Sequence, residues 1–230
     1  MISIILPTKN EPLIEQLIKE IKSTLEKNKN PYEIIAIDDS DDSTFDKLKK
    51  ARITALKQKT VGLGGAIIEG LNFAKGDFLV TMDADFSHNP KYIPKLVDKS
   101  NKGGFDIVIG SRREPGGKII GWNLNRKIIS STANYVGKHL AGIKVSDITS
   151  GFRLYKKEVI DNTNFNDIKS KGYAFQLEIL GKAKNNGFKI GSIPITFVNR
   201  KEGISKLSKK EILYFLFTAL RIRFLNISII

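Results

Sequence analysis

The chain has 230 residues, of which 41% are hydrophobic and 27% are charged, so it can bury the core of one large domain or two small ones. It contains no Cys, which excludes disulfides, thiolate metal sites and Cys nucleophiles and suits a reducing compartment. The first apolar run ends at Pro7 with no basic residue before it, so we expect no secretory signal there.

The net charge of +14 at pH 7 lies almost entirely in the second half of the chain. Lys and Arg exceed Asp and Glu by 1 in residues 1–115 and by 13 in residues 116–230. An excess of this size favours an anionic partner, which can be a nucleic acid, an anionic membrane surface or a phosphorylated substrate. A Lys-rich, solvated surface without a specific partner is the alternative.

In the first half, short apolar runs alternate with stretches whose apolar residues recur at helical spacing. The runs predict strands over residues 2–7, 32–38, 52–56, 77–82 and 105–110. The periodic stretches predict helices over residues 12–27, 42–50, 64–74 and 90–100. This alternation predicts an α/β fold in which helices cover both faces of a parallel sheet.

The second half is less regular. Helical periodicity recurs over residues 122–142 and 172–187. Residues 189–200 alternate like an edge strand, which is the one kind of strand that tolerates Pro194. Residues 200–208 are polar and predict a loop.

The C-terminal stretch, residues 208–230, is amphipathic and strongly apolar. Its longest uncharged run has nine residues, fewer than the ~20 that span a bilayer, but the stretch is suited to lie in a membrane interface. The aromatic residues that would enter the acyl boundary are Tyr214, Phe215, Phe217 and Phe224. The basic residues that would reach phosphates are Lys209, Lys210, Arg221 and Arg223. A helix that packs on the core is the equally weighted alternative.

Polar side chains follow four of the predicted strands. They are Thr8, Asn10, Glu11, Asp38, Asp39, Asp83, Asp85, Ser111 and Arg112. Because ligands of parallel α/β sheets bind beyond the carboxyl ends of the strands, these four coinciding clusters predict a site at that edge of the sheet.

The segment DADFSHNP places Asp83 and Asp85 on either side of a small residue, Ala84. Carboxylates this close repel each other, and Mg²⁺ or Mn²⁺ offsets the repulsion by taking oxygen ligands from one or two carboxylates and from substrate phosphates. We therefore predict a divalent metal site here. A cap for the helix that begins near Pro90 is the alternative, but it explains only one of the two acids.

Three other features are weaker. Asp38 and Asp39 lie in an Asp- and Ser-rich stretch that is as typical of a turn as of ribose or base recognition. His88, in the metal loop, is interpreted as a solvated side chain in preference to a metal ligand or a neighbour of one. The Gly-rich residues 61–70 do not follow the dinucleotide-binding pattern and indicate only a helix start near bound nucleotide.

Eight segments occur in order along the chain: PTKNE, DDS, GLGGAIIEGL, DADFSHNP, IGSRR, DITSGFR, KGYAFQLEIL and RKEGISKL. Together they resemble glycosyltransferase family 2, in its branch of dolichol-phosphate mannose synthases, from residue 2 to about residue 223. The resemblance implies a GT-A fold, which is Rossmann-like and has a mixed, mostly parallel sheet with helices on both faces. We expect residues 1–207 to form the catalytic domain and residues 208–230 an interfacial helix.

The resemblance also implies roles for individual residues. Those that would bind the donor nucleotide are Pro7, Glu11, Ile37, Asp38, Asp39, Asp83, Ala84, Asp85, Arg112, Arg200 and Lys206. Those that would carry catalysis are Asp85, Arg112, Arg126, Arg200 and Lys206. Asp83 and Asp85 would hold the metal, and Arg126 would face the lipid phosphate. The segment that would line the acceptor side is Ser150, Gly151, Phe152 and Arg153. Lys9 and Ser87 depart from the family, which usually has Tyr at the first position and, in its mannose synthases, often Gln at the second.

The activity that the resemblance implies is metal-dependent, inverting transfer of mannose from GDP-mannose to dolichyl or polyprenyl phosphate, with Mg²⁺ or Mn²⁺. A phosphate monoester is mostly dianionic near pH 7, with a second pKa of ~6, so it needs no strong general base to attack. Transfer of glucose from UDP-glucose to the same lipid is the alternative, and a basic nucleic-acid-binding module is the alternative outside the enzymes. We expect the chain to work at the cytoplasmic face of a membrane, either peripherally or anchored by a further domain, with no nucleic-acid partner.

Overall fold

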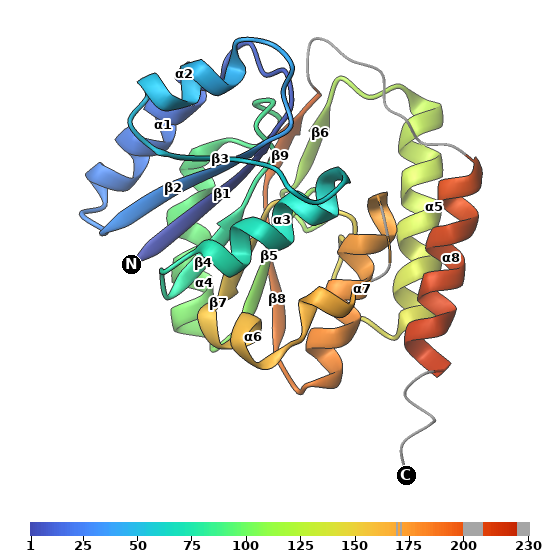
Figure 1. Ribbon diagram of the computed structural model, residues 1–230. Helices are drawn as coiled ribbons and strands as arrows, with labels where there is room; N and C mark the ends of the chain where they lie inside the picture. Colours follow the sequence, from blue (N-terminus) through green and yellow to red (C-terminus); the bar gives the residue numbers. More distant parts are fainter. Residues whose placement is uncertain (169, 171, 200–208, 225–230) are drawn as a thin grey trace.

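The computed structural model describes residues 1–168, 170, 172–199 and 209–224 (Figure 1). Its strands are β1 (Ile2–Thr8), β2 (Tyr32–Asp38), β3 (Thr54–Lys57), β4 (Phe78–Thr81), β5 (Ile107–Ser111), β6 (Lys118–Ile120), β7 (Arg153–Lys156), β8 (Ile190–Pro194) and β9 (Thr196–Val198). Its helices are α1 (Ile14–Lys27), α2 (Thr44–Lys50), α3 (Gly62–Phe73), α4 (Ile93–Gly103), α5 (Leu124–Ala141), α6 (Lys157–Asn162), α7 (Gly172–Asn185) and α8 (Lys209–Phe224). Two short 3₁₀ turns are η1 (Pro90–Tyr92) and η2 (Phe165–Asp167).

The main sheet has seven strands in the order β3-β2-β1-β4-β7-β5-β8. Its strands are parallel except β7, which runs antiparallel to both of its neighbours, β4 and β5. A second, two-stranded sheet pairs β6 with β9 in parallel. The predicted α/β fold with a mixed, mostly parallel sheet is therefore confirmed.

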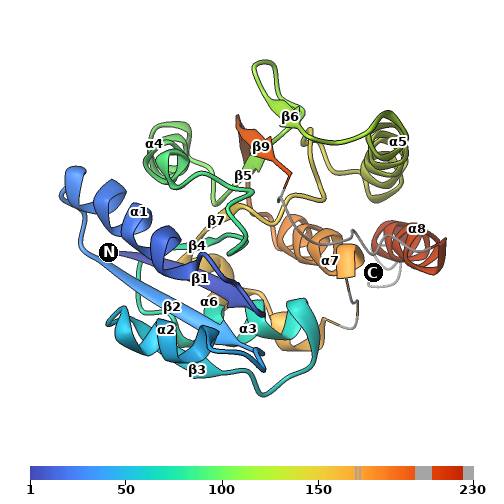
Figure 2. The ribbon, with the colours of Figure 1, turned by 90° about the horizontal axis from the view of Figure 1, so that it is seen from above.

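Helices cover both faces of the main sheet (Figures 1 and 2). Because side chains alternate along a strand, Ile4 and Leu6 of β1 pack in one core cluster with α1, α2 and α4, whereas Ile5 packs in another with α3, α6 and α7. In α1, the buried residues are Ile14, Leu17, Ile18, Ile21 and Leu25, which lie on one face at helical spacing. The spacing of apolar residues in the sequence thus corresponds to the faces with which these strands and helices pack together in the core.

The predicted edge strand over residues 189–200 is divided into two strands. β8 lies at the edge of the main sheet, as Pro194 requires, and ends at that residue. The chain then leaves the sheet, and Thr196–Val198 pairs with β6 instead. This change of sheet brings β9 against the loop after β4, where the Val198 amide donates to the Ser87 carbonyl at 3.2 Å.

The helix α8 lies alongside α5 and α7 (Figure 2). Phe215, Ala219 and Ile222 are buried in the core that α8 shares with these helices. The expectation that Phe215 enters a lipid boundary is therefore wrong, because α8 has an inner as well as an outer apolar face. Arg221 pairs with Glu178 at 2.7 Å. No helix in the described part of the chain is long and apolar enough to cross a membrane.

Candidate active site

The ends of β1, β2 and β3 are tied together by the carboxylate of Asp38. It is buried, and it accepts hydrogen bonds from Thr8 Oγ1 at 2.9 Å, Ser40 Oγ at 2.6 Å and Lys57 Nζ at 2.8 Å. Burial alone would raise the pKa of Asp38, but these donors outweigh it and lower the pKa below its usual value. Both carboxylate oxygens are used inside the protein, so Asp38 sets the shape of this edge.

Asp39, next along the chain, is exposed. Its Oδ2 lies 2.7 Å from Lys9 Nζ, and this contact raises the pKa of Lys9. Pro7 and Ile37 face each other in the register of β1 and β2, and the Glu11 amide donates to Thr44 Oγ1 at 3.0 Å. The residues expected to bind the nucleoside therefore lie along two adjacent strand ends.

The Asp83–Asp85 turn follows β4 directly. Ala84 points into the core, where it is 3% exposed, while both carboxylates stay partly exposed. Asp85 Oδ1 accepts from the Ser87 amide at 3.0 Å, and Phe86 between them has a φ of 61°. This left-handed conformation is strained for a bulky residue, and such strain is concentrated at functional sites.

His88 is buried beneath this turn, so the preferred interpretation of a solvated side chain is wrong. Its Nδ1 accepts from the Asp83 amide at 3.3 Å, and its ring stacks on Phe152 with 5.2 Å between centroids. Burial lowers the pKa of His88 more than the charges of Asp83 and Asp85 raise it. A neutral ring therefore supports the main chain of the turn.

The turn fits a divalent cation. In the described part of the chain, no group of three or more His, Cys, Asp and Glu side chains gathers as a metal site, so Asp83 and Asp85 would act as a pair. Mg²⁺ commonly binds in this way, keeping waters and taking its other ligands from substrate phosphates. The Ser87 hydroxyl, buried beside the turn without a hydrogen-bond partner among the described residues, leaves a further oxygen for such a ligand shell.

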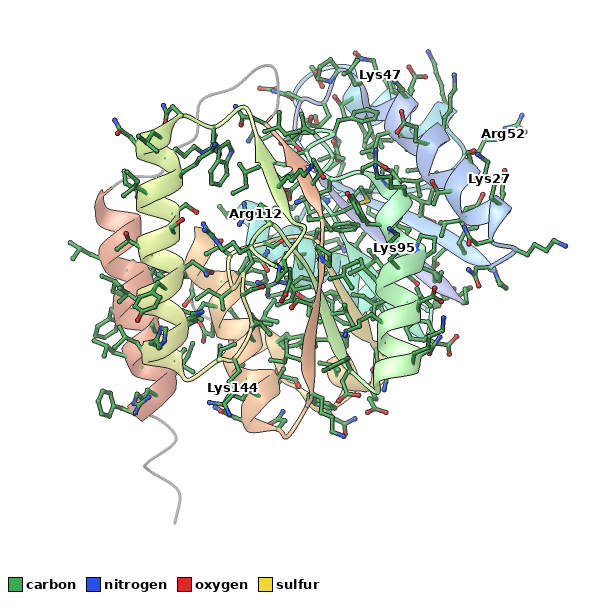
Figure 3. The ribbon with its side chains drawn as sticks, turned by 180° about the vertical axis from the view of Figure 1, so that it is seen from behind. Lys27, Lys47, Arg52, Lys95, Arg112 and Lys144 are labelled. Atoms are coloured by element: carbon green, nitrogen blue, oxygen red, sulfur yellow. The ribbon has the colours of Figure 1, made fainter. Side chains whose placement is uncertain are left out.

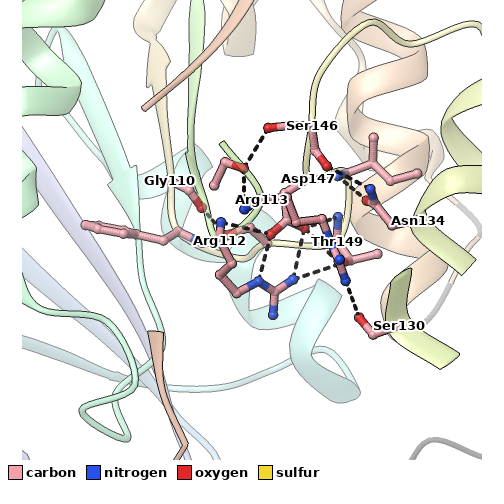
Figure 4. Close-up of polar contacts among 12 residues, drawn as sticks. Gly110, Arg112, Arg113, Ser130, Asn134, Ser146, Asp147 and Thr149 are labelled. Atoms are coloured by element: carbon pink, nitrogen blue, oxygen red, sulfur yellow. Dashed lines mark hydrogen bonds and ion pairs between the residues drawn. The ribbon is translucent and has the colours of Figure 1, made fainter. Parts of the chain in front are cut away.

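Across the site, Arg112 is held by a buried carboxylate, Asp147 (Figure 4). The guanidinium donates through Nε to Oδ2 at 2.7 Å and through Nη2 to Oδ1 at 2.9 Å. Burial would raise the pKa of Asp147, but the charge and hydrogen bonds of Arg112 outweigh it and hold the pKa far below its usual value. Sequence reasoning missed Asp147, whose only signal was a single acid in the segment DITSGFR.

The segment Ser150–Arg153 is built into the core more than the resemblance implies. Arg153 is fully buried, and its guanidinium donates to the main-chain carbonyls of Ile148, Ser150 and Gln176. Phe152 is also fully buried, against His88. Gly151 comes close to the Asp83–Asp85 turn, since a Cβ on it would lie 3.2 Å from Asp83 Oδ1. Phe152 and Arg153 therefore support the site without lining it.

Two more arginines lie near Arg112, whose side chain is only 8% exposed, whereas Lys27 and Lys95, labelled with it in Figure 3, are exposed. Arg113 donates to the hydroxyls of Ser130 and Ser131. Arg126 donates to Asn199 Oδ1 at 3.0 Å. Arg200 and Lys206, expected to complete this basic side, lie outside the described residues.

These features define an α/β protein with paired acids and clustered arginines at the carboxyl edge of its sheet. The chain matches the family described as Glycosyl transferase family 2 over residues 3–163, and it belongs to that family.

Two mannosyl-transferring enzymes, by their names, resemble the chain along much of its length. A dolichol-phosphate mannosyltransferase of Pyrococcus furiosus is 40% identical over 225 residues, which cover 94% of this chain and 61% of that protein. A polyprenol monophosphomannose synthase of Mycolicibacterium smegmatis is 41% identical over 154 residues, covering 66% of this chain and 58% of that protein. The chain thus spans about 60% of the length of these relatives.

Among solved structures, glucosyl-3-phosphoglycerate synthase from Mycobacterium tuberculosis, in complex with Mn²⁺, UDP and phosphoglyceric acid, has a TM-score of 0.71 at 19% identity. The match covers 95% of this chain and 78% of that one. A second structure of the same enzyme, with Mg²⁺ and UDP, has a TM-score of 0.72 at 18% identity. At this identity the likeness establishes a shared GT-A-like fold.

Proposed function

We propose that the chain transfers mannose from GDP-mannose to a polyprenyl or dolichyl phosphate, with inversion and with Mg²⁺ or Mn²⁺. The observation that carries the proposal is that two partly exposed carboxylates, Asp83 and Asp85, lie near Arg112. The His88 ring accepts from the Asp83 amide and packs against Phe197, and the guanidinium of Arg112 lies over the Phe197 ring at 5.4 Å. The names of the relatives, which act on dolichol, polyprenol and undecaprenyl phosphates, support the lipid acceptor.

The reaction needs little from the protein except placement of charge. An oxygen of the lipid phosphate attacks the anomeric carbon and forms the new bond, while the bond from that carbon to the donor diphosphate breaks and its electrons leave with the nucleoside diphosphate. A single displacement inverts the anomeric centre. The dianionic phosphate carries no proton to remove, so no general base is required.

The leaving diphosphate gains negative charge, and this charge is where stabilisation is needed. A divalent cation held by Asp83 and Asp85 would neutralise it when bound. Arg112, oriented by Asp147, is suited to bind a diphosphate oxygen on the other side, and Arg126 to bind the acceptor phosphate. Arg200 and Lys206 would join them from the loop at residues 200–208.

A lipid acceptor implies a membrane surface, and we propose that the outer faces of α5 and α8 lie on it. Leu213, Phe217 and Phe224 are 69%, 64% and 57% exposed at helical spacing, and Leu124 and Ile128 of α5 are also exposed. Apolar side chains in such a stripe, with basic residues nearby, suit the headgroup boundary of a bilayer. Since α8 shares a core with α5 and α7, only its outer face is available to contact the membrane.

The test is a donor screen with the purified chain, a short polyprenyl phosphate and either Mg²⁺ or Mn²⁺. We expect GDP-mannose to give a mannosyl-phosphate lipid and EDTA to abolish the product. Transfer from UDP-glucose alone would overturn the choice of mannose. Absence of transfer from every donor, together with absence of GDP and UDP binding by calorimetry, would overturn the enzyme assignment.

A further inference from the structure

The single Trp of the chain, Trp122, lies against two arginines of the candidate site. The guanidinium carbon of Arg126 is 4.2 Å from its ring centroid, and that of Arg112 is 5.3 Å away. Both distances lie within the range at which a cation is attracted by the face of an indole. One aromatic side chain therefore contacts the two arginines that the proposed reaction gives to different phosphates.

The indole offsets a specific cost. Two guanidinium groups on one ring repel each other, and the negative face of the indole attracts both of them. Arg112 also pairs with Asp147, and Arg126 also donates to the amide oxygen of Asn199. The indole N–H of Trp122 is buried without a hydrogen-bond partner among the described residues, so the ring and not the N–H makes the described contacts with the two arginines.

Trp122 is also at one end of a series of aromatic contacts that reaches the Asp83–Asp85 turn. Its ring packs edge-on against Phe197 at 5.6 Å between centroids, and Phe197 packs against His88 at 5.5 Å. His88 in turn accepts from the Asp83 amide. Packed rings have little freedom to shift independently of one another. The Asp83–Asp85 turn and the two arginines are therefore positioned by the same set of packed rings.

We propose that Trp122 is a positioning residue, which holds the guanidinium groups of Arg112 and Arg126 so that a nucleoside diphosphate and a lipid phosphate bind side by side. The proposal rests on the proposed function for the identity of the two anions. The contacts of the Trp122 ring with Arg112 and Arg126 belong to the folded chain and do not depend on the proposed function.

The kinetic test compares Trp122→Leu, which stays apolar but is smaller and has no π-face, with Trp122→Phe, which is also smaller but keeps an aromatic face. We expect Trp122→Leu to raise the apparent KM for a short polyprenyl phosphate about tenfold, since each cation–π contact is worth about 1 kcal/mol or more and ~1.4 kcal/mol corresponds to tenfold. Trp122→Phe should recover most of that loss. An unchanged KM in Trp122→Leu, with a wild-type melting temperature, would overturn the proposal.

A double-mutant cycle with Arg126→Ala separates positioning from general loosening of the fold. If Trp122 acts through Arg126, adding Trp122→Leu to Arg126→Ala should change the acceptor KM much less than it does in the wild type. Independent, multiplying effects on KM would contradict the proposal.

A nuclear magnetic resonance measurement gives a readout that needs no activity. The Nε proton of Arg126, assigned by its loss in Arg126→Ala, should be displaced by the ring current of Trp122 in the wild type. The displacement should disappear in Trp122→Leu and persist in part in Trp122→Phe. A resonance unmoved by Trp122→Leu would overturn the contact, whereas a wild type that shows the displacement but transfers no sugar would overturn the proposed function alone.

Discussion

Asp85 combines a charge with a structural hydrogen bond, and a single substitution separates the two. In Asp85→Asn the side-chain oxygen can still accept from the Ser87 amide, so the turn should keep its shape while it loses half of its negative charge. We expect metal-dependent transfer to fall by about 100-fold or more, because stabilisation of the leaving charge is lost. The melting temperature should stay close to that of the wild type.

The measurement is the initial rate with saturating Mn²⁺ for Asp85→Asn and for a matched control, Asp98→Asn, on the exposed surface of α4. The control should retain wild-type activity. Turnover of Asp85→Asn within threefold of the wild type would contradict the proposal that Asp85 binds the metal.

Because of Asp147, the free energy of unfolding should depend on pH in the acid range. Its pKa is depressed in the folded protein by Arg112, despite burial, and returns to about 4 in the unfolded chain. As the pH falls below about 4, the unfolded chain therefore takes up a proton before the folded protein does, and stability declines. Above that pH the carboxylate is ionised in both states and its stabilisation is complete.

In Asp147→Asn this part of the acid decline should be absent, because position 147 no longer titrates. The same change leaves Arg112 without its carboxylate partner, so the free energy of unfolding near pH 7 should fall by about 3 to 5 kcal/mol. Urea unfolding at a series of pH values measures both effects. Asp161→Asn, which breaks an exposed pair with Lys157, is the control and should cost no more than about 1 kcal/mol.

At the scale of elements, hydrophobic periodicity predicted β1, α1 and β2 almost to the residue. It missed β7, because Arg153 in this short strand is buried through hydrogen bonds to carbonyls and has no apolar pattern to reveal it. The same limit applies to His88 and Asp147, whose burial depends on partners distant in sequence. Local pattern indicates which residues gather at the sheet edge, whereas long-range contacts decide which of them face a ligand.

The two faces of α8 predict a separation between membrane binding and stability. Replacing Leu213 and Phe217 by Ser alters only the exposed face, so binding to lipid vesicles should weaken about tenfold or more while the melting temperature stays unchanged. Activity on a detergent-dispersed, short-chain acceptor should persist. Vesicle sedimentation measures the binding, with Phe73→Ser, exposed at the end of α3, as the control.

Deletion of α8 would not make this distinction, because Phe215, Ala219 and Ile222 belong to the core. Retention of full vesicle binding by the Leu213→Ser, Phe217→Ser variant would exclude the outer face of α8 from the membrane contact.

At the scale of the whole molecule, the charge of the chain follows its architecture. The half that carries Asp38, Asp83 and Asp85 is nearly balanced, whereas the half that carries Arg126, α5 and α8 holds almost all of the excess positive charge. This division matches the proposal that nucleotide and metal bind at β1 to β4 and that the lipid binds at the later helices. Composition alone predicted an anionic partner, but only the fold places the exposed apolar stripes on this basic half.

The excess positive charge predicts a salt dependence that identifies the partner. Binding to vesicles that contain anionic lipid should weaken steeply as NaCl rises from 0.05 M to about 0.5 M, since the Debye length falls from over 10 Å to about 4 Å and each basic residue near the surface contributes about 1 kcal/mol. Binding to neutral vesicles should change little. Binding to an oligonucleotide that is equally salt-dependent and unaffected by the Leu213→Ser, Phe217→Ser substitutions would instead favour the nucleic-acid alternative, because that mode needs the charges but not the apolar stripe.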